Sequence, residues 1–165
     1  MTADPAVRPA TPEDAPALAG LVAGLMAAEG KTHAPPTPEQ LAAWLAGDRP
    51  MVEVLLAEAD GGGTGGRAVG YLAFYRAFSL FRPGPVMLVE NVYVVAAARG
   101  TGVAARLLAA AARTALARGW GRLELNVADD NAGACAAYRA LGFIAPGESV
   151  RRVEDARLAA LAQRA

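Results

Sequence analysis

One segment of this sequence, a strand that turns through glycines directly into a helix, is well suited to binding an anion. The run Arg99-Gly100-Thr101-Gly102-Val103-Ala104 follows the apolar residues Val94 and Val95 and opens an alanine-rich stretch. The first N–H groups of a helix have no partners within the helix and together carry about half a positive charge, and glycines let a backbone approach an anion closely. The junction therefore predicts a site for a phosphate or pyrophosphate.

Two common phosphate loops can be compared with this junction. A Walker A loop ends in Gly-Lys-Ser/Thr, which is missing here, so nucleoside triphosphate hydrolysis is disfavoured. Gly100 to Ala105 does match the looser dinucleotide pattern G-x-G-x-x-A, which leaves an NAD(P)-binding oxidoreductase as an alternative. That pattern normally follows the first strand of a parallel half, and Asp129 and Asp130 lie far downstream for the ribose role. A mixed sheet would exclude the dinucleotide interpretation.

The strand before the junction has a polar middle. Val86 to Val95 is apolar except for Glu90 and Asn91 near its centre, and such a run is typical of a central strand. Burial there would raise the pKa of the Glu90 carboxyl toward the range that suits a general base. From the residues alone, a strand carboxylate paired with an arginine explains Glu90 about equally well.

Hydrophobic spacing and turn signals predict the elements that position these residues. Helices are expected to about Ala28 after a cap at Thr11, over Glu39–Ala46 after Thr37, from the glycine junction to Arg118, and over Ala132–Leu141 after Asn131. Strands are expected at Val7–Ala10, Val52–Ala59, Ala68–Ala77, Val86–Val95 and Leu123–Val127. The middle three form an antiparallel meander, and the strand-helix-strand unit after them requires a parallel crossover. We expect one α/β domain over residues 1–165 with a mixed central sheet.

Composition excludes several classes of protein. Lys plus Arg and Asp plus Glu both number 16, and 54% of the residues are apolar, which excludes a disordered chain and a strongly basic nucleic-acid binder. One cysteine, Cys135, and one histidine, His33, cannot supply a disulfide or a Cys/His zinc site, so we expect no metal. No secretory pattern or membrane span is evident. We expect a soluble cytoplasmic protein with no nucleic-acid or membrane partner.

Two segments resemble the Gcn5-related N-acetyltransferases (GNAT). Arg99 to Ala104 is similar to that family's signature Q/R-x-x-G-x-G/A. The second segment runs from Leu125-Asn126-Val127 through Tyr138 to Leu141-Gly142-Phe143, and it resembles the family pattern N…A…Y…LGF. The order of predicted elements agrees over nearly the whole chain. The resemblance implies the GNAT fold, in which a parallel strand pair is splayed around CoA, and acetyl transfer from acetyl-CoA to an amine.

The resemblance also implies roles for individual residues. The CoA pyrophosphate would be bound by backbone N–H groups and flanked by Arg99, the N–H groups being those of Gly100, Thr101, Gly102, Val103 and Ala104. The pantetheine arm would pair with the backbone of Val92, Tyr93 and Val94, and Asn131 would contact it from the opposite side. Glu90 becomes the base that accepts the amine proton, and Tyr138 the acid that protonates the departing thiolate. Without the resemblance, the helical spacing of Tyr138 indicates a packing residue.

The sequence says less about which amine accepts the acetyl group. The segment Val86–Val94, the chain length and the ending Val153–Ala162 most resemble the diamine and thialysine acetyltransferase branch. Asn91, which we expect to contact the substrate, stands where that branch usually has an acid. Arg76 and Arg82 fall in the loop region expected near the acceptor and would repel a diamine. We therefore expect the primary amine of a small molecule, with a diamine or thialysine as an alternative.

Further alternatives remain at this point. Acetylation of a protein amine is possible because acceptor loops are where this fold varies. A non-catalytic CoA-binding module would keep the phosphate site but lack a competent base and acid. A homodimer is expected because relatives commonly pair, and a predicted C-terminal helix has an apolar face with Leu158, Leu161 and Ala162. His33, in a proline-rich loop, is predicted to face solvent.

Overall fold

The computed structural model describes residues 6–59, 66–145 and 147. The chain divides into two compact units, residues 1–126 and 127–165, and each is described by itself. The first unit contains the strands β1–β5 and the helices α1–α3, and the second contains α4. The predicted C-terminal helix, with Leu158, Leu161 and Ala162, lies outside the described residues.

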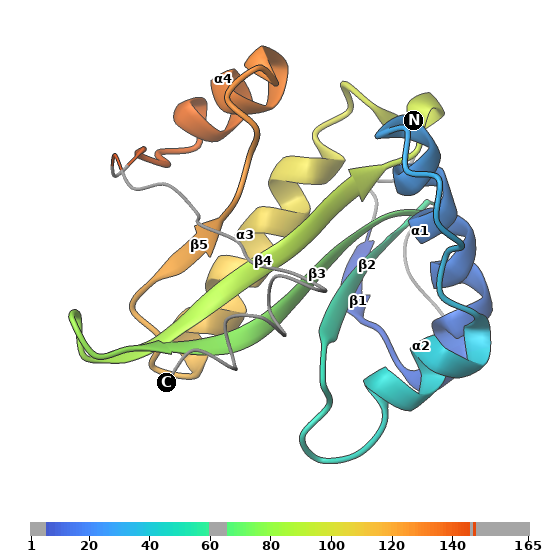
Figure 1. The fold of residues 1–165 in the computed structure, drawn as a ribbon, viewed down its shortest axis with the longest axis horizontal. Coiled ribbons are helices and arrows are strands. Elements are labelled where there is room, and N and C mark those ends of the chain that lie inside the picture. The colour runs from blue at the N-terminus through green and yellow to red at the C-terminus, as the bar shows by residue number, and fades with distance from the viewer. Residues whose placement is uncertain (1–5, 60–65, 146, 148–165) are drawn as a thin grey trace, which may run out of the picture. The chain divides into compact units, whose positions relative to one another are not determined.

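The first unit is organised by a five-stranded mixed sheet in the order β1-β2-β3-β4-β5 (Figure 1). The strands are β1 (Ala6–Pro9), β2 (Glu53–Glu58), β3 (Ala68–Ser79), β4 (Gly84–Val94) and β5 (Leu123–Leu125). Neighbouring strands pair antiparallel from β1 to β4, whereas β4 and β5 are parallel. This confirms the predicted meander and parallel crossover, and it excludes the all-parallel half that a dinucleotide site requires.

The helices follow their predicted spans closely. They are α1 (Ala15–Ala28, after a 3-10 turn at Pro12–Asp14), α2 (Pro38–Leu45), α3 (Val103–Ala117) and α4 (Ala132–Ala140). The start of α2 is a reciprocal cap: Gln40 N–H donates to Thr37 Oγ1 at 3.3 Å, and Thr37 N–H donates to Gln40 Oε1 at 2.9 Å. Each bond satisfies a backbone donor that the helix itself cannot, which explains why α2 begins after Thr37.

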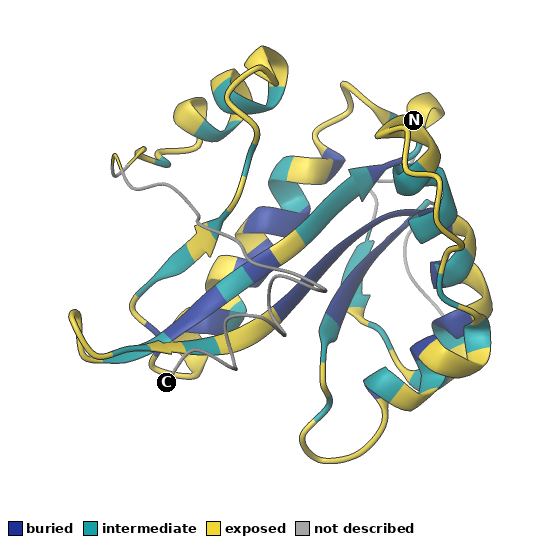
Figure 2. Cartoon of the chain, in the orientation of Figure 1, coloured by how far each residue is buried: buried dark blue, intermediate teal, exposed yellow. Residues whose placement is uncertain are grey.

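The two faces of the sheet are covered by different helices. Alternate residues of a strand point to opposite faces, and one face packs with α1 and α2 in an apolar cluster that includes Leu18, Leu41, Leu56, Tyr71 and Ala73. Helix α3 packs against β2, β3 and β4, and its buried residues form one stripe. Figure 2 shows the buried residues concentrated along the middle strands and the inward sides of these helices. The packing on both faces therefore fixes the position of β4, from which the turn into α3 begins.

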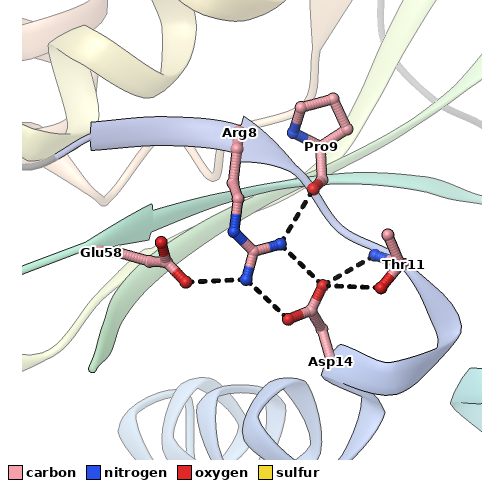
Figure 3. Close-up of polar contacts among 5 residues, drawn as sticks. All are labelled: Arg8, Pro9, Thr11, Asp14 and Glu58. Carbon is pink, nitrogen blue, oxygen red and sulfur yellow. Dashed lines mark hydrogen bonds and ion pairs between the residues drawn. The ribbon is translucent and has the colours of Figure 1, made fainter. Parts of the chain in front are cut away.

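An ion-pair network joins β1, β2 and the turn before α1 (Figure 3). Arg8 Nη2 lies 2.7 Å from both Glu58 Oε1 and Asp14 Oδ1, and Arg8 Nη1 lies 2.8 Å from Asp14 Oδ2. Thr11 N–H donates to Asp14 Oδ2 at 2.8 Å. Hydrogen bonds from Arg8 lower the pKa of the Asp14 carboxyl to about 2, and the side chain of Glu58 is only 2% exposed. We call these four residues the Arg8 network.

The strand predicted after α3 is shorter than expected. Alternation predicted Leu123–Val127, but β5 ends at Leu125. Val127 already belongs to the second unit. None of the described helices is long and apolar enough to cross a membrane.

Candidate acetyl-CoA site

The glycines between β4 and α3 adopt the conformation that the sequence predicts. Gly100 and Gly102 have φ angles of 76° and 82°, in the left-handed region that favours glycine. Within the described chain, the N–H groups of Gly100, Thr101 and Gly102 donate to no backbone acceptor, and α3 has no side-chain cap. We call residues 100–102 the glycine loop. Together with the first turn of α3 it presents a row of unpaired donors, which is the chemistry of an anion site.

Two arginines engage backbone carbonyls on either side of these donors. Arg99 Nε donates to Val94 O at 3.1 Å, and its guanidinium carbon lies 5.9 Å from the centroid of the Tyr93 ring. Arg106, from the first turns of α3, donates through Nη2 to Thr101 O at 2.8 Å. Arg99 is exposed, as a residue that flanks a bound anion should be. Arg106 is not among the residues that the sequence predicted for the site, although its place one turn inside the helix was a usable signal.

The outer edge of β4 is open next to the glycine loop. Its parallel pairing with β5 covers only Met87–Val89, so the residues from Glu90 to Val94 have no strand partner on that side in the described part of the chain. Val95 N–H donates to Val69 O at 2.9 Å, and the alternation of an antiparallel ladder then turns the backbone groups of Val92 and Val94 away from β3. This open edge can pair with an extended amide chain. Tyr93, by the same alternation, pairs with β3.

Glu90 occupies an irregularity in β4. Ala73 is opposite Asn91 and Phe74 is opposite Val89, so Glu90 is an additional residue that the ladder leaves unpaired. The expectation that Glu90 is buried is wrong: its side chain is exposed. The bulge displaces this position from the regular pleat, which an apolar sequence pattern cannot reveal. Glu90 therefore stands as a solvated carboxylate at one end of the open edge, with the glycine loop at the other.

Register places the neighbouring polar residues on defined faces. Asn91 is opposite Ala73 and shares the α1 face with Tyr71, whose ring centroid lies 6.3 Å from that of Tyr93. Arg76 lies within β3, opposite Met87, and its side chain belongs to the other face; the expectation of a loop position for Arg76 is wrong. Arg82 does lie in the turn between β3 and β4 and is exposed. Only Arg82 thus has the predicted loop position.

The second unit holds the other two predicted site residues on or beside α4. Asn131 Oδ1 accepts from Ala134 N–H at 3.1 Å, which confirms Asn131 as the helix cap. Tyr138 is half-buried, with its ring centroid 5.5 Å from that of Phe143. Burial, and to a smaller extent Cys135, raises the pKa of the Tyr138 hydroxyl, so this group stays protonated at neutral pH.

His33 and a metal site were the other features considered from the sequence. His33 is exposed, in the segment between α1 and α2. The described residues contain no group of three or more His, Cys, Asp or Glu side chains that could hold a metal ion. The structure thus groups Glu90, Asn91, Val92 to Val94 and residues 99–104 along one edge of the first unit, and it places Asn131 and Tyr138 in the second.

Comparison with known proteins agrees with this arrangement. The bovine (Bos taurus) thialysine N-epsilon-acetyltransferase is 35% identical over 99 residues, which cover 58% of this chain and 58% of the bovine protein. An integron cassette protein from the mobile metagenome of V. cholerae has the same fold, with a TM-score of 0.78 and 20% identity over 98% of this chain and 99% of that one. An aminoglycoside N-acetyltransferase solved with CoA gives a TM-score of 0.74 and 21% identity over 93% of this chain and 96% of that one.

The family itself is shown by a match over most of the chain. The characteristic pattern of the Acetyltransferase (GNAT) family matches residues 19–143, a span that includes the open edge of β4, the glycine loop and α4. The predicted resemblance is therefore confirmed, and so is the predicted mixed α/β fold. The chain belongs to the GNAT family of acetyltransferases.

Proposed function

We propose that this protein is an N-acetyltransferase that transfers the acetyl group of acetyl-CoA directly to the primary amine of a small molecule. The observation that carries the proposal is the continuity of the site in the first unit: unpaired N–H donors at the glycine loop, an open strand edge, and a carboxylate at the far end of that edge. Four steps of about 3.4 Å separate Glu90 from Val94, or about 14 Å. An extended pantetheine arm has a comparable length.

The acetyl-CoA part of the proposal uses the backbone. The pyrophosphate binds the N–H groups of the glycine loop and of Val103 and Ala104, with the Arg99 guanidinium beside it. The amides of the pantetheine arm pair with the backbone of Val92 and with the N–H of Val94, whose carbonyl already accepts from Arg99 Nε. Asn131 contacts the arm through the part of its amide that does not cap α4. A CoA complex of an aminoglycoside N-acetyltransferase with this fold supports the choice of cosubstrate.

The chemical step needs a neutral amine, a stabilised oxyanion and a protonated leaving group. The amine nitrogen forms a bond to the thioester carbonyl carbon, and a backbone N–H of the open edge donates to the oxygen as negative charge develops. Glu90, being exposed, accepts the amine proton through water. The carbon–sulfur bond then breaks, and the Tyr138 hydroxyl protonates the thiolate. Burial raises the pKa of the Tyr138 hydroxyl, so the group is protonated at neutral pH and holds a proton for the thiolate before the step.

A lysine-like or diamine acceptor is the second candidate. The matched bovine and mouse (Mus musculus) relatives are thialysine N-epsilon-acetyltransferases, and the chain spans 58% of the length of each. Arg76 should repel such an acceptor less than the sequence suggested, because its side chain belongs to the sheet face opposite that of Asn91. Asn91 still replaces the acid expected in that branch. Two other functions remain to be distinguished by the following test: acetylation of a protein amine, and CoA binding without catalysis.

Thiol release from acetyl-CoA in the presence of candidate amines tests the proposal. We expect turnover with at least one member of a panel of diamines, lysine, thialysine, aminoglycosides and short peptides. Glu90→Gln should lower kcat by about 10²- to 10⁴-fold, the usual contribution of a general base, and Tyr138→Phe should lower it as well. Asp48→Asn, at an exposed loop position, is the matched control and should have wild-type activity.

Three results would separate the alternatives. CoA binding without turnover of any amine supports a silent module, and turnover of peptides alone supports a protein acetyltransferase. Failure to bind CoA contradicts the proposal as a whole. A homodimer and a cytoplasmic location remain predictions from the sequence; light scattering of the purified chain measures the first.

A further inference from the structure

Arg106 contacts the glycine loop from inside the helix that follows it. Its Nη2 donates to Thr101 O at 2.8 Å, and its backbone N–H donates to Gly102 O at 3.0 Å. A Cβ built on Gly102 would lie 3.8 Å from Arg106 Nη2, so the guanidinium lies directly beside the loop. The side chain therefore engages one loop carbonyl while the main chain engages the next.

The contact with Thr101 O fixes the direction of a neighbouring donor. The C=O of Thr101 and the N–H of Gly102 belong to one planar trans peptide unit, in which these two groups point in opposite directions. When Arg106 holds the carbonyl, the Gly102 N–H points to the other side. Rotation of this unit changes the ψ angle of Thr101 and the φ angle of Gly102, which is 82°, and glycine also tolerates the φ of the reversed conformation. Without Arg106, the peptide unit could rotate and present a carbonyl where an anion needs a donor.

We infer that Arg106 is a positioning residue that holds the Thr101–Gly102 peptide in the orientation that binds the pyrophosphate of acetyl-CoA. The inference rests on the proposed function. It assigns Arg106 a task distinct from that of Arg99, whose Nε holds Val94 O at the end of β4. Arg106 acts through the backbone, so its removal should weaken binding of the nucleotide half of the cosubstrate and leave the acetyl-transfer step intact.

A comparison of two acetyl donors tests this role. S-acetylpantetheine carries the thioester and the arm but lacks the pyrophosphate, so it does not use the glycine loop. Arg106→Met should raise the Kd for CoA and the KM for acetyl-CoA about tenfold, the scale of one lost charge-assisted hydrogen bond, with kcat unchanged. The kcat/KM for S-acetylpantetheine should stay at the wild-type value. Arg113→Met, an exposed arginine two turns further along α3, is the matched control.

A second measurement does not depend on activity. The backbone N–H order parameters of residues 100–102, measured by NMR relaxation without ligand, should be lower in Arg106→Met than in wild type or Arg113→Met. Equal loss with both acetyl donors, or unchanged CoA binding and unchanged order parameters, would overturn the inference while the proposed function stands. If wild type binds no CoA by calorimetry, the proposed function fails and this inference fails with it.

Discussion

The Arg8 network and the glycine loop are both organised by arginine, but with opposite results for the neighbouring polar groups. Arg8 binds two carboxylates, Asp14 and Glu58, and thereby compensates the charge of the deeply buried Glu58 side chain. Arg99 and Arg106 each donate to a backbone carbonyl beside the glycine loop, and the N–H groups of residues 100–102 have no backbone acceptor in the described part of the chain.

This difference separates stability from function. An arginine paired with carboxylates neutralises charge and stabilises the junction of β1, β2 and the turn before α1. An arginine on a carbonyl orients a peptide and keeps its donor available to a ligand. Changes in the Arg8 network should therefore alter the free energy of unfolding but not the KM for acetyl-CoA, and changes in the glycine loop should act mainly on that KM.

Arg8→Met should have the largest effect on stability. It leaves Glu58 buried without its cation, which typically costs about 3–5 kcal/mol. Chemical denaturation at pH 7 measures the loss, and KM for acetyl-CoA should be unchanged at a temperature where the variant is folded. The double variant Arg8→Met/Glu58→Met removes the unpaired charge and should be more stable than Arg8→Met alone. A double variant as unstable as the sum of both singles would show that the pair is not coupled.

Asp14→Asn should have a smaller and pH-dependent effect. The Asp14 pKa is about 2 in the folded protein against 3.8 for an unperturbed group, so the charged form is favoured by folding. This contribution, about 1–2 kcal/mol for a partly solvated pair, is fully present above about pH 4 and is lost as the pH falls toward 2. Denaturation midpoints of wild type and Asp14→Asn should converge over that interval. Asp48→Asn should show no such convergence, and a constant gap for Asp14→Asn would contradict the assignment.

Gly102→Ala should change stability least and binding clearly. A Cβ has space there, its nearest neighbour being Arg106 at 3.8 Å, so the cost is that of a left-handed alanine, about 1 kcal/mol. The same strain displaces the loop donors, and KM for acetyl-CoA should rise with little change in kcat. Gly121→Ala, at a glycine without positive φ and with open space, is the control. An unchanged KM for acetyl-CoA in Gly102→Ala would show that the glycine loop does not bind CoA.

Much of the fold could be predicted because its signals are local. Thr37 and Gln40 mark the start of α2 through bonds between residues three apart, and Gly100 and Gly102 mark the turn into α3 through their own backbone preference. Three successive strand patterns joined by short connections predicted the antiparallel meander. The length of the helix between β4 and β5 implied their parallel pairing.

Other features depend on contacts that no local pattern encodes. The Arg8 network joins residues 50 positions apart, and nothing near Arg8 in the sequence indicates Glu58. The exposure of Glu90 follows from a bulge in the register of β3 and β4, which the apolar run around it conceals. The placement of Arg76 on the opposite face from Asn91 has the same origin.

The family, the order of the elements and the position of the glycine loop follow from residue type and short spacing, so the sequence was enough to predict them. The pairing of individual groups became known only from the folded chain: Glu90 is exposed, the backbone of Val92 faces away from β3, and Arg106 contacts Thr101 O. Strand register and side-chain reach set these hydrogen-bond partners, and both are fixed only when distant strands and helices pack together.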